Sequence, residues 1–245
     1  MNGLDLFSGI GGISLGLRDY VRPVAYCEID PYCQGVLLSR MAQHAIKQAP
    51  IWDDIRTISG SELVGHVEII YGGFPCQDIS IAGNKKGLDG ERSSLFFDIV
   101  RLVHKIEPQF VFLENVSNIC KIGGSEIIKE FEKVGMECRW CCISARSVGA
   151  PHKRDRWFML AYNNRKPSGQ TYKSSEFVEK VRTSWLRYTG RVRRKVSLFD
   201  WKEGIYPIPG MDDGLPFELD RARALGNAVV PQQVKEAFEI LMGLK

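Results

Sequence analysis

One cysteine stands in a loop where it could act as a nucleophile. Cys76 lies in the stretch Gly72–Ser80, directly after a buried strand that we expect at Val67–Tyr71. An isolated cysteine in an intracellular protein is more often a small buried hydrophobe. Here, however, Pro75 fixes the backbone before the thiol, and the paired glycines allow a tight exit from the strand. A core position needs neither feature, so the pattern favours a reactive thiolate at Cys76.

A carboxylate and two arginines are the other candidates for chemistry. The apolar run Gln109–Leu113 predicts a buried strand that ends in Glu114. Ligands of open α/β sheets bind outside the carboxyl ends of the strands, so Glu114 and Cys76 are expected to face one pocket. Arg154 and Arg156 fall between two later strands. Taken singly, each is also compatible with an ordinary salt bridge or a surface position.

A glycine-rich turn near the N-terminus predicts a nucleotide site. The strand expected at Asn2–Leu6 runs into Phe-Ser-Gly-Ile-Gly-Gly and then into a helical pattern. This order is typical of a nucleotide-binding α/β unit, although Ser14 replaces the third glycine of Gly-x-Gly-x-x-Gly and a plain turn is the simpler interpretation. Glu28 belongs to the strand expected at Pro23–Ile29. It stands where such units commonly bind ribose hydroxyls.

Strands and helices alternate as far as Tyr162, which predicts an α/β fold. Asp54 follows a short stretch at the expected sheet edge, where it could meet an adenine ring or simply cap a turn. The remaining expected elements are helices at 30–41, 94–105, 124–134 and 232–241, and strands near 137–144 and 157–162. We expect a catalytic and cofactor-binding domain at 1–162, a small basic domain at 163–217, and a C-terminal segment at 218–245 that returns to the first domain.

Charge is spread unevenly along the 245 residues. The segment Arg165–Glu203 has eleven Lys/Arg against four Asp/Glu, a local charge of +7 in a chain whose net charge is +4. Such a segment is typical of a polyanion partner, but a solvated basic face gives the same pattern. No apolar run is long enough to span a bilayer, and no signal peptide is evident, so a cytoplasmic protein without a membrane partner is expected.

The seven cysteines are irregularly spaced, which favours reduced thiols over a disulfide framework. Cys138 and Cys141 have Cys-x-x-Cys spacing, with His152 nearby. Structural zinc requires four ligands and no second such pair follows, so no metal site is expected.

Five motifs occur in order along the chain and together resemble those of the DNA (cytosine-5) methyltransferases. They are Asp5-Leu-Phe-Ser-Gly-Ile-Gly-Gly, Gly73-Phe-Pro-Cys-Gln, Glu114-Asn-Val, Arg154-Asp-Arg, and Gly226-Asn-Ala-Val-Val-Pro-Gln. The resemblance covers residues 1–162 and 218–245. It implies a Rossmann-like fold of S-adenosylmethionine-dependent methyltransferases with a small target-recognition domain, which is the basic segment.

The resemblance also implies roles for the catalytic candidates. Cys76 would add to carbon 6 of a flipped-out cytosine, which makes carbon 5 nucleophilic. Glu114, protonated, would serve ring nitrogen 3 and the exocyclic amine, Arg156 would hold the carbonyl oxygen, and Arg154 would support the site. The loop Ile81–Arg92 would close over the base.

The implied cofactor is S-adenosyl-L-methionine, with S-adenosyl-L-homocysteine as product. The matching positions, with Glu28 on the ribose, are Phe7, Gly9, Ile10, Gly12, Glu28, Ile29, Asp54, Ile55, Pro75, Leu95, Asn227 and Ala228. Ile29 stands where many relatives carry an aromatic ring, and His152 stands where a glutamine commonly precedes the arginines. Ala82 stands where some relatives place a polar residue that enters the duplex.

Three functions are compatible with these residues. A sequence-specific methyltransferase acting on double-stranded DNA is favoured over an enzyme acting on RNA, because the RNA branch usually has Pro-Pro-Cys and Phe74 precedes Pro75 here. The third is a non-catalytic DNA-binding protein on the same scaffold, which the intact Cys76, Glu114 and Arg156 disfavour. We expect a monomer, and a cognate restriction endonuclease, if one accompanies it, would act separately.

Overall fold

A computed structural model describes residues 1–75, 94–163, 190–191, 224 and 228–244 of the chain. Cys76, Asn227 and the loop Ile81–Arg92 therefore lie outside the described residues, as do nearly all of the expected basic domain and the segment 218–223. The expected domain boundaries thus remain predictions.

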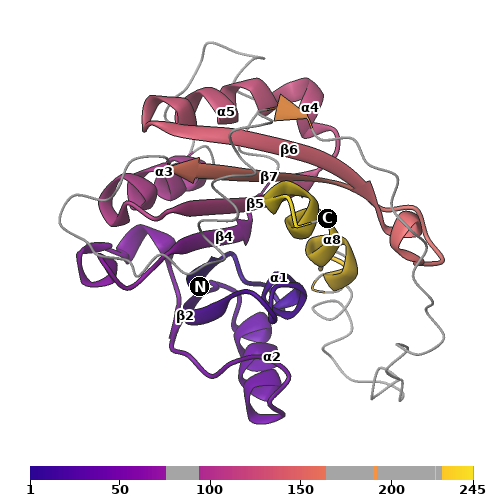
Figure 1. Cartoon of the computed structure of the whole chain (residues 1–245). Helices are drawn as coiled ribbons and strands as arrows, with labels where there is room; N and C mark the ends of the chain where they lie inside the picture. Colours follow the sequence, from indigo (N-terminus) through magenta and orange to yellow (C-terminus); the bar gives the residue numbers. More distant parts are fainter. Residues whose placement is uncertain (76–93, 164–189, 192–223, 225–227, 245) are drawn as a thin grey trace.

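The described strands form one eight-stranded sheet in the order β3-β2-β1-β4-β5-β7-β6-β8, as predicted for an α/β fold (Figure 1). The pairs from β3 to β5 are parallel, whereas β7 runs antiparallel to both β5 and β6. In chain order the strands are β1 (Asn2–Leu6), β2 (Arg22–Cys27), β3 (Ile51–Trp52), β4 (Ile69–Gly73), β5 (Phe110–Val116), β6 (Met136–Ser144), β7 (Asp155–Asn163) and β8 (Gly190–Arg191).

Helices cover both faces of the sheet. One apolar cluster contains Leu4, Ile70 and Val111 from the strands, and α3 and α5 pack on it; the opposite cluster contains Tyr71 and Phe112, and α1 and α8 pack there. Because both faces are buried, the central strands are continuous apolar runs rather than alternating ones. The helices are α1 (Gly12–Gly16), α2 (Pro31–Ala42), α3 (Ser94–Ile106), α4 (Ile119–Ile122), α5 (Gly124–Lys133) and α8 (Pro231–Met242).

Several expected boundaries shift. β2 ends at Cys27, although the Glu28 amide still donates to the Trp52 carbonyl at the end of β3, and the Glu28 carboxylate accepts from the amides of Gly9 and Asp30. β4 lies two residues further along than expected, at Ile69–Gly73. β5 continues through Glu114 to Val116, because its last residues pair with β7. The sequence analysis also missed the short elements α4, β3 and three 3₁₀ turns, η1 (Ile55–Thr57), η2 (Ser61–Leu63) and η4 (Ala145–Val148).

In the part of the chain that the structure describes, no helix has the length and apolar character needed to cross a bilayer. The same residues contain no cluster of three or more side chains suited to hold a metal ion.

Candidate active site

Glu114 and Arg156 form an ion pair at the carboxyl end of the parallel part of the sheet. The Nε atom of Arg156 lies 2.6 Å from Oε1 of Glu114, and the two side chains are only 15% and 12% exposed. The register of β5 and β7 places Arg156 opposite Val116, two residues beyond Glu114. Residues two apart share a face of a strand, so the antiparallel pairing itself brings these side chains together.

Burial sets the protonation of Glu114. Loss of solvent raises the pKa of its carboxyl to about 7, although the charges of Arg156 and Arg154 act in the opposite direction. Burial also lowers the pKa of Arg154, with the positive charge of Arg156 as a second cause. A carboxyl with a pKa near neutrality can donate as well as accept a proton, which is the behaviour expected of a general acid.

Two glycines at the end of β4 allow close approach of neighbouring groups, and the second, Gly73, makes room for this pair. A Cβ atom added at Gly73 would lie 2.8 Å from Oε2 of Glu114, and one added at Gly72 would lie 2.0 Å from the carbonyl oxygen of Leu6. Gly73 pairs with Glu114 in the parallel register of β4 and β5. The strand that leads to Cys76 therefore ends directly beside the carboxylate.

Asn115 holds the backbone that precedes Cys76. Its buried amide nitrogen donates to the carbonyl oxygen of Phe74 over 2.9 Å, and its amide oxygen accepts from the backbone of Val116. Pro75 follows and is exposed. Asn115 belongs to the motif Glu114-Asn-Val, from which no role could be predicted for it; in the structure it fastens β5 to the exit of β4.

Gln233, a residue that sequence reasoning missed, holds the arginine segment. Its side chain is fully buried on α8, and Nε2 donates to the carbonyl oxygens of Ile143 and Arg154 over 2.9 and 2.7 Å. One amide thus fastens the end of β6 and the start of β7 to the C-terminal helix. No local sequence pattern signals this role, because the two acceptors are 90 and 79 residues away.

The glycine turn after β1 is open on the side where a ligand would lie. Phe7, Gly9 and Gly11 have positive φ angles of 52°, 52° and 80°, and among the described residues none beyond its two chain neighbours comes within 4 Å of a Cβ atom built at Gly9. The Gly9 amide donates to Oε2 of Glu28 over 2.7 Å, and Asp30 donates to Oε1 over 2.8 Å. Each carboxylate oxygen keeps a second lone pair, which suits ribose hydroxyls. Burial raises the pKa of Glu28, opposed by these backbone bonds.

The C-terminal segment packs against this turn. Ala228 lies against the cluster that contains Ile10, and a Cβ atom added at Gly12 would lie 3.0 Å from the side chain of Val229. Arg40 on α2 donates from Nη1 to the carbonyl oxygen of Ile10. The structure therefore brings together Gly9, Ile10, Gly12, Glu28 and Ala228, and their role in binding the cofactor remains a prediction.

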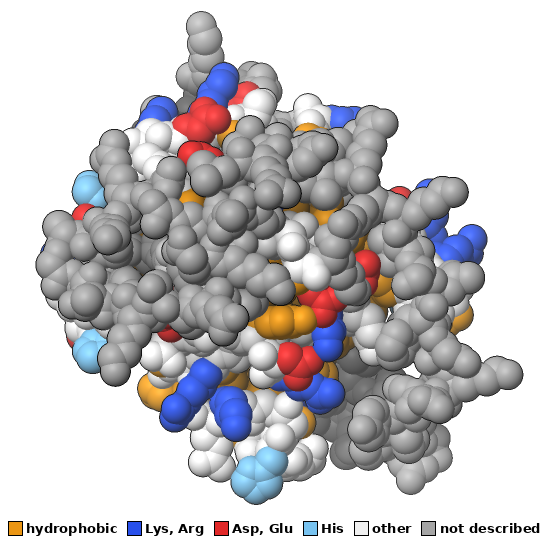
Figure 2. All heavy atoms as spheres, in the orientation of Figure 1, with side chains coloured by type: hydrophobic (Ala, Val, Ile, Leu, Met, Phe, Trp, Pro, Cys, Tyr) orange, Lys and Arg blue, Asp and Glu red, His pale blue; other side chains and the backbone are white. Residues whose placement is uncertain are grey.

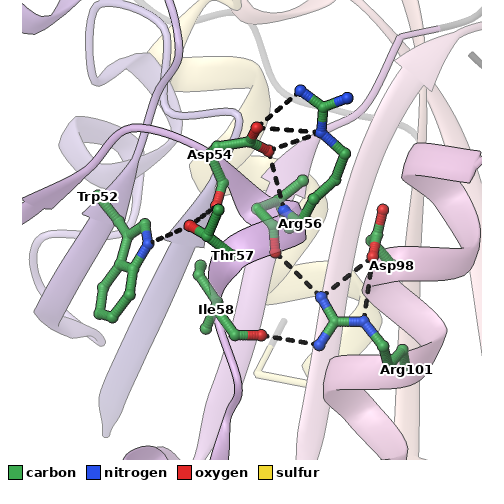
Figure 3. A network of polar contacts seen from close by, with 8 residues as sticks. Trp52, Asp54, Arg56, Thr57, Ile58, Asp98 and Arg101 are labelled. Atoms are coloured by element: carbon green, nitrogen blue, oxygen red, sulfur yellow. Dashed lines mark hydrogen bonds and ion pairs between the residues drawn. The ribbon is translucent and has the colours of Figure 1, made fainter. Parts of the chain in front are cut away.

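Two of the residues predicted to contact adenine, Asp54 and Ile55, lie at the start of the turn η1 (Figure 3). The Asp54 carboxylate accepts from the backbone, Nε and Nη2 of Arg56, an ion pair that lowers its pKa. Ile55 is only 3% exposed and packs into the core below, where Leu95 of α3 also lies. Ile29, by contrast, is 65% exposed. An aliphatic side chain that is this exposed beside Glu28 could cover one face of a planar ring.

Charges of both signs lie close together on the described surface (Figure 2). Four exposed ion pairs illustrate this mixing, namely Arg56 with Asp54, Lys133 with Glu130, Lys153 with Asp155, and Lys235 with Asp19. The predicted basic segment falls almost wholly outside the described residues, so its contact with a polyanion remains a prediction.

A family model and individual relatives both place this chain in one family of DNA methylases. The model of the C-5 cytosine-specific DNA methylase family matches residues 1–203. The type II methyltransferase M.CviJI of Paramecium bursaria Chlorella virus IL3A is 31% identical over 236 residues, which cover 96% of this chain and 58% of that protein. The type II methyltransferase M.HhaI of Haemophilus parahaemolyticus is 31% identical over 166 residues, covering 66% and 49%.

A solved structure has the same fold. The crystal structure of a DNMT2 mutant from Spodoptera frugiperda superposes with a TM-score of 0.58 at 16% identity, covering 81% of this chain and 57% of that one. The Rossmann-like methyltransferase architecture is therefore confirmed. The chain spans about half the length of the curated relatives it matches, 58% and 49% for the two above.

Proposed function

The chain belongs to the C-5 cytosine-specific DNA methylase family, and we propose that it transfers a methyl group from S-adenosyl-L-methionine to carbon 5 of cytosine in double-stranded DNA. The observation that carries this proposal is the buried Glu114 carboxyl with a pKa near 7, held 2.6 Å from Arg156 beside the exit of β4. That exit leads to Cys76. A nucleophile, an acid and a fixed cation are the three groups that activation of a pyrimidine ring requires.

Carbon 5 of cytosine is a weak nucleophile, because its electrons belong to an aromatic ring. In the proposed reaction the Cys76 thiolate bonds to carbon 6, and the electrons of the 5,6 double bond become available at carbon 5. Glu114 donates its proton toward ring nitrogen 3, and Arg156 donates to the carbonyl oxygen as negative charge develops. Carbon 5 would then bond to the methyl group, with S-adenosyl-L-homocysteine as the leaving group. Loss of the carbon 5 proton to a base returns its electrons to the 5,6 double bond as the bond from carbon 6 to sulfur breaks. This step releases the Cys76 thiolate, and the proton on nitrogen 3 returns to Glu114, which restores the aromatic ring.

The donor groups around the glycine turn fit S-adenosyl-L-methionine. When bound, it supplies an electrophilic methyl group. Glu28 would hold the ribose hydroxyls with its remaining lone pairs, and the open side of Gly9 leaves space for the backbone to approach the ligand. The proposal also includes the residues predicted to contact the methionine and adenine ends of the cofactor. They are Phe7, Ile10, Gly12, Ile29, Asp54, Ile55, Pro75, Leu95, Asn227 and Ala228.

The target atom is out of reach inside a duplex, so the proposal includes extrusion of the cytosine, at about a few kcal/mol. The loop Ile81–Arg92 would cover the extruded base and exclude water. The basic domain at 163–217 would contact phosphates and read base edges. These parts rest on the family resemblance.

DNA is proposed as the substrate rather than RNA. The relatives at 31% identity are named type II methyltransferases. The likeness to DNMT2, at 16% identity, concerns the fold. A cognate restriction endonuclease would act as a separate protein, and the methyltransferase would act as a monomer.

The experiment that tests the proposal is incubation of the protein with methyl-labelled cofactor and either duplex DNA or transfer RNA. We expect label in DNA only, and bisulfite sequencing of DNA from expressing cells would then give the target sequence. Cys76→Ser should abolish turnover and leave DNA binding in place. Label in RNA alone would overturn the choice of substrate, and full activity of Cys76→Ser would remove that thiol from the mechanism.

A further inference from the structure

A single guanidinium on α3 holds the turn that carries two of the proposed adenine contacts. Arg101 donates from Nη1 to the carbonyl oxygen of Ile58 over 2.7 Å and from Nη2 to that of Ile55 over 3.0 Å. Its Nε donates to Asp98, one turn earlier on α3, over 3.0 Å. Figure 3 shows this fork between the helix and the turn. All three edges of the planar group are therefore engaged.

The two carbonyl groups that Arg101 binds define the position of η1. The turn has only three residues, and two backbone bonds close it, from the Thr57 amide to the Asp54 carbonyl over 3.0 Å and from the Ile58 amide to the Ile55 carbonyl over 3.3 Å. A short 3₁₀ turn has few internal bonds, so bonds from outside contribute much of its rigidity. The side chains of Ile55 and Ile58, 3% and 1% exposed, anchor the turn in the core beneath.

Arg101 also connects this turn to the other wall of the proposed adenine site. Leu95 lies on the same helix as Arg101 and packs on the same apolar cluster as Ile55. Asp54 begins η1, and its carboxylate caps the turn by accepting from the amide of Arg56. A displacement of η1 relative to α3 would therefore move Asp54 away from Leu95.

Lys105 provides a matched comparison on the same helix. It is exposed and lies four residues beyond Arg101 on α3. The charge of an exposed lysine is screened by solvent and salt.

From this geometry we propose that Arg101 is a positioning residue for adenine recognition: it fixes η1 against α3 so that the Asp54 carboxylate faces the amino group of the ring. The proposal rests on the proposed function, which supplies the cofactor. Arg101 acts through the backbone of Ile55 and Ile58 and touches no ligand.

The test is a calorimetric titration of the whole chain with S-adenosyl-L-homocysteine. We expect Arg101→Gln to raise Kd about tenfold, the effect of losing roughly one charge-assisted hydrogen bond. Arg101→Lys keeps the charge, but its single ammonium group reaches only one of the two carbonyls at a time. Its Kd should therefore lie between those of the wild type and Arg101→Gln. Lys105→Gln also removes one positive charge from α3, and its Kd should stay within about twofold of the wild type.

A second ligand separates positioning from general loosening. The inosine analogue of S-adenosyl-L-homocysteine lacks the amino group, so the wild type should bind it about tenfold more weakly. In Arg101→Gln this preference should fall to about threefold, because Asp54 no longer faces the ring. If that variant fails to fold, Arg101→Lys carries the same comparison.

Two results would overturn the proposal: an unchanged preference between the ligands in the Arg101 variants, or equal effects of Lys105→Gln and Arg101→Gln. Either would leave the proposed function standing, since the wild type would still bind S-adenosyl-L-homocysteine. A wild type that binds neither ligand would instead overturn the proposed cofactor, and the role of Arg101 with it.

Discussion

The two halves of the candidate site are built differently. On the base side, the charged side chains of Glu114 and Arg156 are buried and meet because two antiparallel strands set their register. On the cofactor side, backbone amides and carbonyls of short turns line the site, and arginines from α2 and α3 hold them. Removing water makes charge effects large, whereas a lost bond to a partly buried backbone carbonyl costs less. We therefore expect the largest loss of activity from substitutions on the base side and smaller changes in cofactor affinity from substitutions on the cofactor side.

The largest effect should come from Glu114→Gln. The amide has nearly the same shape but cannot deliver a proton to ring nitrogen 3, so kcat should fall about a thousandfold. Single-turnover methylation of a short duplex measures it. Asp155→Asn, next to Arg156 on β7 but 39% exposed in its side chain, is the control and should remain active. If kcat of Glu114→Gln stays within tenfold of the wild-type value, the carboxyl does not transfer a proton in the reaction.

The next effect is the pH dependence of stability. The pKa of Glu114 rises from 4.5 to about 7 on folding, so the folded protein holds a proton that the unfolded chain releases between these values. The contribution of Glu114 to stability is thus fully present below pH 4.5 and is lost as the pH rises toward 7 and above. Relative to Glu114→Gln, the wild type should lose roughly 2–3 kcal/mol across this window. Urea unfolding of both proteins at several pH values measures the difference, and parallel curves would contradict the raised pKa.

Gln233→Ala should have a smaller effect on the base side. It leaves the buried carbonyls of Ile143 and Arg154 without the amide that bonds them, so the free energy of unfolding should fall by about 2–3 kcal/mol. Because the Arg154 backbone shifts, kcat should fall about tenfold. Gln232→Ala, a half-buried neighbour, is the control for chemical denaturation and kinetics. Equal behaviour of the two variants would remove Gln233 from this role.

The smallest effect should come from Arg40→Met on the cofactor side. This change removes one bond to the Ile10 carbonyl and keeps most of the aliphatic stem. The Kd of S-adenosyl-L-homocysteine should rise about threefold with kcat unchanged. A drop in kcat at saturating cofactor would break the contrast between the two halves of the site.

Sequence reasoning predicted the elements better than their contacts. The glycine turn, the acid after β2 and the order of strands follow from local patterns, and β1 was predicted with its correct bounds, Asn2–Leu6. The Glu114 and Arg156 contact could not be derived from local pattern, because it depends on an antiparallel register between β5 and β7. Arg101 and Gln233 could not be found at all, since their acceptors are backbone carbonyls, which every residue has.

The end of β4 also shows how one short stretch can be constrained for two separate reasons. At Gly72 any side chain would overlap the backbone of β1, with a Cβ atom 2.0 Å from the Leu6 carbonyl oxygen. At Gly73 it would meet the Glu114 carboxylate instead, at 2.8 Å. Strand pairing therefore selects the first glycine and catalysis the second. In a library that randomises both positions, soluble expression should restrict position 72, while position 73 should vary freely until methylation is demanded.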